Sequence, residues 1–250
     1  MGDHREISLP PGNDNLCIVL ANPGHDGNIG AVARSMLNFG ITDLRVIGRD
    51  GEWSDEARNR AKNAQTVLDS AKLVSTFADA TSDCSVIVGT SGKREDGDKT
   101  ALRHFLLPGE LPKRLSGIDG RVAMVFGPEN KGLLNEELRL CDLLVTIPTW
   151  EGYPILNLSH AVSIICFSWY VNSDTIPPTG SRNRLLDSDL RNTLRSEVSR
   201  LVKSMPANEH KRKGIEETLV RVIMRGLPKD DEIHRLLGVI TDAADAFEEG

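Results

Sequence analysis

Short runs of consecutive apolar residues, rich in Val and Ile, recur along the first 172 residues and constrain the fold more than any other feature of this chain. Such uninterrupted runs are typical of strands covered on both faces, as in a parallel sheet between two helical layers. Between them, 29–39 and 158–170 carry apolar residues at helical spacing. The sequence therefore predicts an α/β domain with a mostly parallel sheet, whose strands lie at 16–21, 44–48, 86–89, 122–126 and 143–148.

A separate helical unit is expected in the last quarter of the chain. Residues 173–184 include two adjacent prolines, a glycine and several small polar residues, which prevent a continued helix and mark a linker. Beyond the linker, three apolar stripes at helical spacing predict three helices. We therefore expect an α/β domain at 1–172 and a helical C-terminal domain at 185–250.

The charge of the chain is unevenly distributed. A net charge of −6 excludes an indiscriminate binder of polyanions. However, residues 182–229 carry a local charge of +6, and Lys211, Arg212 and Lys213 lie in this basic segment. These side chains are candidates for contacts with RNA phosphates. The alternative is a solvated helical face that is balanced by the acids after it.

Several classes of protein are not indicated by the sequence. No stretch reaches the roughly 18 apolar residues of a membrane span, and the N-terminal residues lack the apolar run of a secretion signal. The four cysteines lie far apart without a C-x-x-C spacing, so we interpret them as reduced core residues. The six histidines show no metal-ligand spacing. We expect a cytoplasmic protein with no metal and no membrane partner.

The first candidate motif, ANPGHDGNIGAVAR at 21–34, runs from a predicted strand into a helix. Its glycines at 24, 27 and 30 permit tight turns and close ligand approach beside a helix N-terminus. Their spacing differs from the G-x-G-x-x-G fingerprint, which makes a NAD-dependent oxidoreductase an alternative and not the favoured interpretation. Asn28 and Arg34 are more than about 100° apart on a helix and can converge if Asn28 lies in the loop.

Two more segments follow predicted strands. In VFGPENKGL at 125–133, Glu129 lies just past a strand end, where α/β sheets bind ligands. The alternative for Glu129 is an acid that stabilises the start of the next helix. TSGKR at 90–94 offers backbone N–H groups and hydroxyls after another strand, which is not specific by itself.

The segment IPTWEGYPILNLSH at 147–160 also follows a strand and leads into a helix. Asn157 either caps this helix or presents its amide to a substrate. Trp150 and Tyr153 either stack on a base or pack in the core, and core packing is the expectation for isolated aromatic residues.

Taken together and in this order, NIGAVAR at 28–34, FGPENKGL at 126–133 and ILNLS at 155–159 resemble the three signature motifs of the SPOUT superfamily of RNA 2′-O-ribose methyltransferases. The resemblance covers residues 16 to about 172. It implies a deep trefoil knot in the C-terminal part of the α/β domain, a homodimer, and S-adenosylmethionine held by the backbone of the knotted loops. The helical tail is similar to that of the branch that methylates nucleotide 32 in the tRNA anticodon loop.

The same resemblance implies roles for individual residues. The catalytic group is expected to comprise Asn28, Arg34, Glu129, Asn157 and Ser159. S-adenosylmethionine is expected to contact Thr90, Ser91, Gly92, Gly127, Ile147, Pro154, Ile155 and Leu156. The run TSGKR replaces the more usual TSARSR, but Gly92 would contribute only backbone, so binding should survive.

The family assigns the role of base to the arginine that corresponds to Arg34. A guanidinium, with a pKa above about 12, is a poor base. We therefore expect Arg34 to position the ribose or its phosphate and to stabilise the developing alkoxide.

Two alternatives stay within RNA binding. One is 2′-O-methylation of ribosomal RNA with the tail as a targeting module, and the other is RNA binding without catalysis. The polar set of Asn28, Arg34, Glu129 and Asn157 argues against the second, because binding alone needs no such cluster.

Overall fold

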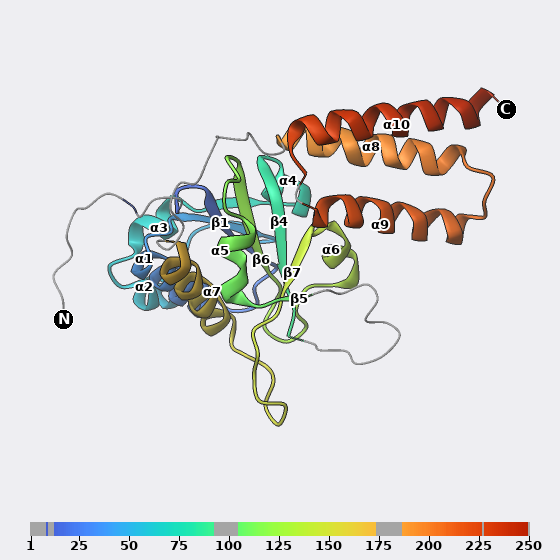
Figure 1. Ribbon diagram of the computed structural model, residues 1–250. Coiled ribbons are helices and arrows are strands. Elements are labelled where there is room, and N and C mark those ends of the chain that lie inside the picture. Colours follow the sequence, from blue (N-terminus) through green and yellow to red (C-terminus); the bar gives the residue numbers. More distant parts are fainter. Residues whose placement is uncertain (1–8, 10–12, 93–104, 174–186, 227, 250) are drawn as a thin grey trace.

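The computed structural model describes residue 9 and residues 13–92, 105–173, 187–226 and 228–249 (Figure 1). Within them lies a seven-stranded sheet of order β3-β2-β1-β6-β4-β7-β5, in which all neighbouring strands are parallel. The predicted parallel α/β fold is thus confirmed. The strands are β1 (Leu16–Ala21), β2 (Asp43–Ile47), β3 (Lys72–Val74), β4 (Cys84–Thr90), β5 (Phe105–Leu106), β6 (Arg121–Phe126) and β7 (Leu143–Val145).

The central strands are buried on both faces, as their apolar runs predict. All six residues of β1 are 0% exposed. Its even-numbered residues belong to one hydrophobic core and its odd-numbered residues to the other. Each fully buried Leu or Ile stabilises the fold by about 1.5–3 kcal/mol. The sequence did not reveal β3, two of whose three residues are exposed, or β5, which has only two residues.

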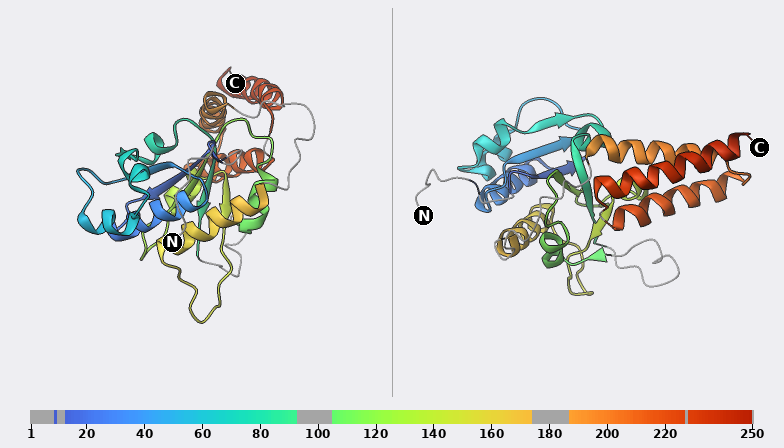
Figure 2. Two further views of the ribbon diagram at one scale, coloured as in Figure 1. Left: turned by 90° about the vertical axis from the view of Figure 1, so that its left-hand side faces the viewer. Right: turned by 45° about the horizontal axis from the view of Figure 1, so that its top comes forward.

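Helices cover both faces of the sheet (Figures 1 and 2). Their apolar residues divide between the two cores. The larger core contains residues of α1 (Asp26–Asn38), α2 (Asp55–Ala61), α3 (Gln65–Asp69), α5 (Leu111–Arg114) and α7 (Leu158–Ser173); α5 directly follows the 3-10 turn η2 (Pro108–Glu110). The smaller core contains residues of α4 (Phe77–Thr81) and α6 (Asn135–Leu140).

The two longest helices of the α/β domain, α1 and α7, pack against each other. The hydroxyls of Ser35 and Ser163 are hydrogen-bonded at 2.6 Å between them. Phe39, which follows α1, contacts the rings of Phe167 and Tyr170 on α7. The next residue, Gly40, has a φ of +69°, the left-handed conformation that commonly ends a helix. These contacts fix the helix that follows the first motif beside the helix that follows the third.

The C-terminal residues form three helices, as their apolar stripes predict: α8 (Ser188–Ser204), α9 (Glu209–Arg225) and α10 (Asp230–Glu249). Figures 1 and 2 show them projecting together from one side of the sheet. They share a core of their own, which includes Leu194, Val198, Met224, Ile233 and Ile240. Asn208 Oδ1 accepts the backbone N–H of Lys211 at 2.9 Å and so caps the start of α9.

A buried ion-pair cluster, here called the docking ion pairs, attaches α8 to the sheet. Asp142 precedes β7 and its side chain is 0% exposed. Its carboxylate accepts from the Arg191 guanidinium at 3.0 and 3.1 Å and from Arg195 Nη2 at 2.8 Å. It also accepts the backbone N–H of Ile87 in β4 at 2.9 Å. The helical tail is therefore held in part by Arg191 and Arg195, two arginines of the basic segment 182–229.

Some expectations about organisation stay predictions. Apart from Ser173, which ends α7, the linker expected at 173–184 lies outside the described residues. The domain division and the trefoil knot likewise stay predictions. All four cysteines are free and buried, which confirms their interpretation as core residues. No helix of the described residues has the length and apolar character to cross a membrane.

Candidate functional site

Three segments that are distant in sequence meet at the carboxyl edge of the sheet. Asn28 lies in the first turn of α1, which follows β1. Glu129 comes three residues after β6, the parallel neighbour of β1, and Asn157 directly precedes α7. The carboxyl edge of an open parallel sheet is where α/β proteins bind ligands. The three predicted residues therefore lie at the most suitable place for a site.

The side chains of Asn28, Glu129, Asn157 and Ser159 form a hydrogen-bonded chain, here called the amide network. Asn28 Nδ2 donates to Glu129 Oε1 at 2.5 Å, and Asn157 Nδ2 donates to Asn28 Oδ1 at 3.1 Å. Asn157 Oδ1 accepts from the Ser159 hydroxyl at 2.7 Å. Because each amide both donates and accepts, the chain fixes which edge of each amide faces outward. The network thus supplies oriented dipoles.

Glu129 anchors the network as a carboxylate. Burial would raise its pKa, but hydrogen bonds from Asn28 and from the backbone of Gly24 outweigh this effect and hold the pKa below its usual value. The Gly24 N–H lies 2.9 Å from Glu129 Oε2. A carboxylate with a lowered pKa is a weak base, so Glu129 is better suited to orient neighbours than to remove a proton. The Gly24 contact was missed by the sequence analysis, which considered this glycine only as a turn residue.

Asn157 caps α7, as one of its two interpretations predicts, and its contact with a substrate stays a prediction. Its Oδ1 accepts the backbone N–H of Ser159 at 2.9 Å, while its backbone carbonyl accepts from Ala161 at 3.0 Å, which is the geometry of a helix N-cap. The same side chain binds Asn28 through Nδ2. The cap therefore orients the amide that faces the site.

Two of the three glycines of the first motif serve helix packing. A Cβ at Gly30 would lie 2.0 Å from the carbonyl oxygen of Ala57, and one at Gly27 would lie 2.3 Å from the Glu56 carboxylate, both on α2. Both glycines are inside α1 and buried. They let two helices approach and do not form a loop that cradles a dinucleotide, which argues against the oxidoreductase alternative.

Arg34 does not join the amide network within one chain. Asn28 lies inside α1, so the six-residue spacing places the two side chains about 120° apart around the helix. Arg34 is exposed, and among the described residues it has no hydrogen bond or ion pair. A role in catalysis therefore requires the target RNA or another subunit to bring the guanidinium and the network together.

The residues expected to hold S-adenosylmethionine gather at the same sheet edge. Thr90 ends β4, Gly127 follows β6 and Ile147 lies just beyond β7, and these three strands are adjacent. Ser91 continues β4 by donating its N–H to Val145 at 3.1 Å. A Cβ at Gly92 would meet no atom of the described residues within 4 Å. Among the described residues no group of three or more His, Cys, Asp or Glu side chains is placed to hold a metal.

The loop between β7 and α7 carries the remaining cofactor candidates and projects from the sheet (Figure 1). Pro154 and Ile155 are exposed and Leu156 is half-buried. Trp150 and Tyr153 in this loop are 79% and 78% exposed. The expectation that these aromatic residues pack in the core is therefore wrong, because the loop lies outside both cores.

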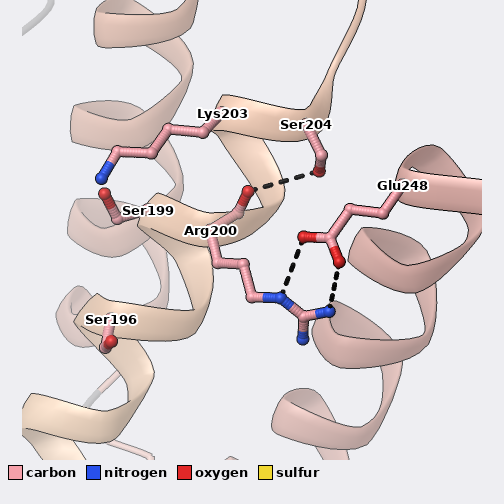
Figure 3. Close-up of a pocket in the computed structure, with 6 residues that line it drawn as sticks. All are labelled: Ser196, Ser199, Arg200, Lys203, Ser204 and Glu248. Carbon is pink, nitrogen blue, oxygen red and sulfur yellow. Dashed lines mark hydrogen bonds and ion pairs between the residues drawn. The ribbon is translucent and has the colours of Figure 1, made fainter.

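Much of the basic charge of the tail is already paired. Besides the docking ion pairs, Arg200 of α8 binds Glu248 of α10 at 3.1 and 2.8 Å beside a pocket of about 630 Å³ (Figure 3). This pocket contains both signs of charge and none of the amide network. The arginines of α8 therefore serve to attach the tail to the sheet, through Arg191 and Arg195, and to join α8 to α10, through Arg200.

The predicted RNA-binding residues lie together in the first turns of α9. Lys211 and Lys213 are exposed, and in the described part of the chain neither forms an ion pair. Arg212 instead donates Nε and Nη2 to the carbonyl oxygen of Met205 at 3.1 and 2.7 Å. The two lysines are thus free to meet a polyanion, whereas Arg212 stabilises the turn between α8 and α9.

The parallel sheet, with the three motif residues at its edge, has the arrangement that the resemblance to SPOUT methyltransferases implies. Comparison with known proteins gives the family more closely. The model of the SpoU rRNA methylase family matches residues 15–167. The chain belongs to this family.

Individual relatives agree with this assignment. The chain is 39% identical over 188 residues to the tRNA (cytidine-2′-O-)-methyltransferase TrmJ of Methanocaldococcus jannaschii. The aligned region covers 75% of this chain and 78% of that protein. The crystal structure of TrmJ from Z. mobilis ZM4 superposes with a TM-score of 0.72 at 26% identity, over 90% of this chain and 97% of the other. AviRb from Streptomyces viridochromogenes, solved in complex with AdoMet, shares the fold at 21% identity and a TM-score of 0.51, over 68% of this chain and 62% of the other.

Proposed function

We propose that this protein transfers a methyl group from S-adenosylmethionine to a ribose 2′-hydroxyl of tRNA in the cytoplasm, at nucleotide 32 of the anticodon loop. The observation that carries the proposal is the amide network, built from all three family motifs at the sheet edge where the cofactor candidates gather. The tRNA substrate is supported by the M. jannaschii relative and by the helical tail, which the Z. mobilis structure also spans.

The chain's own residues supply orientation. When bound, S-adenosylmethionine would supply an electrophilic methyl on a sulfonium and leave as S-adenosylhomocysteine, while the proton of the 2′-hydroxyl would pass to solvent water. The backbone at Ser91, Gly92, Gly127 and Ile147 would hold the cofactor at the edge of the sheet. The amide network, fixed by the Glu129 carboxylate, holds the ribose so that its 2′-oxygen faces the methyl. Effective molarities of about 10⁵ M or more are attainable by such alignment. Arg34 positions the nucleotide phosphate and balances negative charge on the 2′-oxygen.

A homodimer is part of the proposal. The buried face of α7 packs on the sheet, yet Ile164, Phe167, Tyr170 and Val171 on the same helix are 37–53% exposed. Monomeric proteins seldom leave so apolar a helix face in water, whereas a symmetric pair buries it. In such a dimer, the exposed Arg34 on the neighbouring α1 joins the amide network of the second subunit. A Phe167→Glu variant is expected to sediment as a monomer and lose activity; an unchanged dimer would overturn this assignment.

The lysines of α9 are proposed to bind tRNA backbone outside the catalytic pocket. Replacing both Lys211 and Lys213 with Ala should weaken tRNA binding. It should also reduce, by close to 2, the magnitude of the slope of the logarithm of the association constant against the logarithm of the salt concentration. Arg212→Ala serves as a contrast because its guanidinium is engaged by Met205. This variant should lower the free energy of unfolding and leave the salt slope of tRNA binding nearly unchanged. An unchanged slope in the double variant would remove the lysines from the interface.

The reaction is tested with labelled methyl donor and a panel of unmodified tRNA transcripts, followed by mapping of the methylated nucleotide. Label is expected at nucleotide 32, and a transcript with 2′-deoxyribose at that position should take up none. Label on ribosomal RNA with tRNA left unmodified would replace the proposed substrate. Tight tRNA binding without transfer to any RNA would exclude catalysis.

A further inference from the structure

Trp150, in the loop between β7 and α7, has its indole ring exposed to solvent. It is one of three tryptophans in the chain and is 79% exposed. The other two are more buried and hydrogen-bonded: half-buried Trp53 donates Nε1 to the Leu68 carbonyl at 2.8 Å, and Trp169, 8% exposed, donates to Asn13 at 3.1 Å. An indole buries a large apolar surface when it finds a partner. The exposed ring of Trp150 is thus a surface prepared for a ligand.

The loop holds this indole in a defined place. The N–H of Tyr153 donates to the carbonyl of Trp150 at 3.0 Å and closes a tight turn, and Thr149 Oγ1 donates to the Pro154 carbonyl at 3.1 Å just outside it. A Cβ at Gly152 would lie 2.3–2.6 Å from three atoms of the indole. The benzo part of the indole therefore lies close to Gly152, while most of the ring is open to solvent.

The position of the turn links the indole to the amide network. Pro154 is three residues before Asn157, a span of at most about 11 Å of chain. Thr149, bonded to Pro154, directly precedes Trp150. A nucleotide whose ribose lies at Asn157 therefore has its neighbours along the strand within reach of the indole.

From these observations, and on the basis of the proposed function, we infer that Trp150 stacks on an unpaired base next to the target nucleotide. Glu151, the next residue, is exposed and its carboxylate would repel a phosphate close by, so the contact is made by the face of a base. The unpaired bases of single-stranded RNA can stack on aromatic side chains, whereas the bases of a paired helix are already stacked on one another. Trp150 acts as a positioning residue that selects looped-out RNA.

Tryptophan emission tests the inference directly, since Trp150 is the exposed fluorophore. Titration of wild-type protein with an unmodified tRNA transcript should quench this emission, and a fully paired RNA hairpin should not. The Trp150→Ala protein should show no quenching by either RNA. A concentration-dependent change without RNA, and none with it, would assign the indole to contact between copies and overturn the inference.

Steady-state kinetics separate stacking from a structural role. Trp150→Ala should raise the KM for tRNA about 5- to 150-fold, with the KM for S-adenosylmethionine and the kcat unchanged. Trp150→Phe, which keeps a smaller ring, should recover part of the loss, and Gly152→Ala should resemble Trp150→Ala because the new methyl displaces the indole. Val239→Ala, which truncates a 68% exposed residue of α10, is the matched control and should behave as wild type.

The outcomes distinguish this inference from the proposed function. Methyl transfer to tRNA with no quenching, and a KM of Trp150→Ala equal to that of the control, would overturn the stacking role and leave the reaction standing. Quenching by tRNA without methyl transfer to any RNA would overturn the proposed reaction and leave the stacking role of Trp150 standing.

Discussion

The amide network and the docking ion pairs are both polar clusters on an apolar sheet, and they are built on opposite principles. In the docking ion pairs, a fully buried carboxylate is neutralised by two guanidinium groups, and the four hydrogen bonds that it accepts leave no place for a ligand. In the amide network, the only charge is Glu129, and Asn157 lies exposed at the sheet edge. The first cluster joins two parts of the chain, whereas the second stays open to a substrate.

This comparison predicts the largest effect for the loss of Asp142. Asp142→Ala leaves Arg191 buried without a counter-charge and is expected to lower the free energy of unfolding by roughly 3–5 kcal/mol. Denaturant unfolding measures the loss. The matched control is Glu217→Ala, which breaks a partly exposed ion pair with Arg139 that also joins the tail to the α/β domain at 3.2 Å. The control variant should lower the free energy of unfolding by less than about 1 kcal/mol. Equal losses in the two variants would contradict the conclusion that Asp142 is the main residue attaching α8 to the sheet.

The amide network should respond in activity more than in stability. Glu129→Ala frees both Asn28 and the Gly24 N–H and is expected to lower kcat about 100-fold, a loss typical for the removal of one oriented polar group. Glu129→Gln keeps an acceptor oxygen and should lose less. Calorimetry should find S-adenosylmethionine affinity unchanged in both variants. Lost cofactor affinity would instead place Glu129 in the cofactor site.

The two roles of Asn157 can be separated by a pair of variants. Asn157→Asp keeps an oxygen for the backbone of Ser159 but loses the donor to Asn28, so it should lower kcat while α7 stays capped. Asn157→Ala loses both contacts and should also cost about 1 kcal/mol in thermal or denaturant unfolding. If Asn157→Asp retains wild-type kcat, the bond to Asn28 has no part in turnover.

The smallest effect is expected from pH. Because the pKa of Glu129 is lowered in the fold, its carboxylate stabilises the native state fully above the unfolded value of about 4.3, and this contribution is lost as the pH falls through the lowered pKa. The wild-type Tm should exceed that of Glu129→Gln by a constant margin above about pH 5. The margin should shrink below about pH 4. A margin that grows on acidification would contradict the sign of the pKa shift.

Much of the fold could be predicted because each strand and helix carries its own local pattern. The run LCIVLA in β1 is apolar at every position and is buried at every position. The stripe of α8 likewise matches its packed face, and that of α10 does so at Ile233, Leu237 and Ile240 but not at Leu236 and Phe247, which are exposed. By contrast, Leu73 in β3 is 37% exposed, and such a strand is defined by its pairing with β2 instead of its own pattern.

The site was predicted in its members more than in its geometry. Asn28, Glu129 and Asn157 were recognised from motif resemblance, and each lies in the amide network. Spacing could not show that Arg34 stands apart, since that depends on Asn28 lying inside α1. Composition could not show that Arg191 and Arg195 neutralise a buried Asp142, because the partners are 49 and 53 residues away.

The sequence by itself determined the parallel sheet, the three-helix tail and the polar residues at the ends of the strands, because hydrophobic period and turn chemistry act over neighbouring residues. Only the tertiary structure decided which charges are paired, which glycines pack helices and which tryptophan faces water. Those properties depend on groups brought together from distant segments, where burial changes the free energy of every charge and aromatic ring.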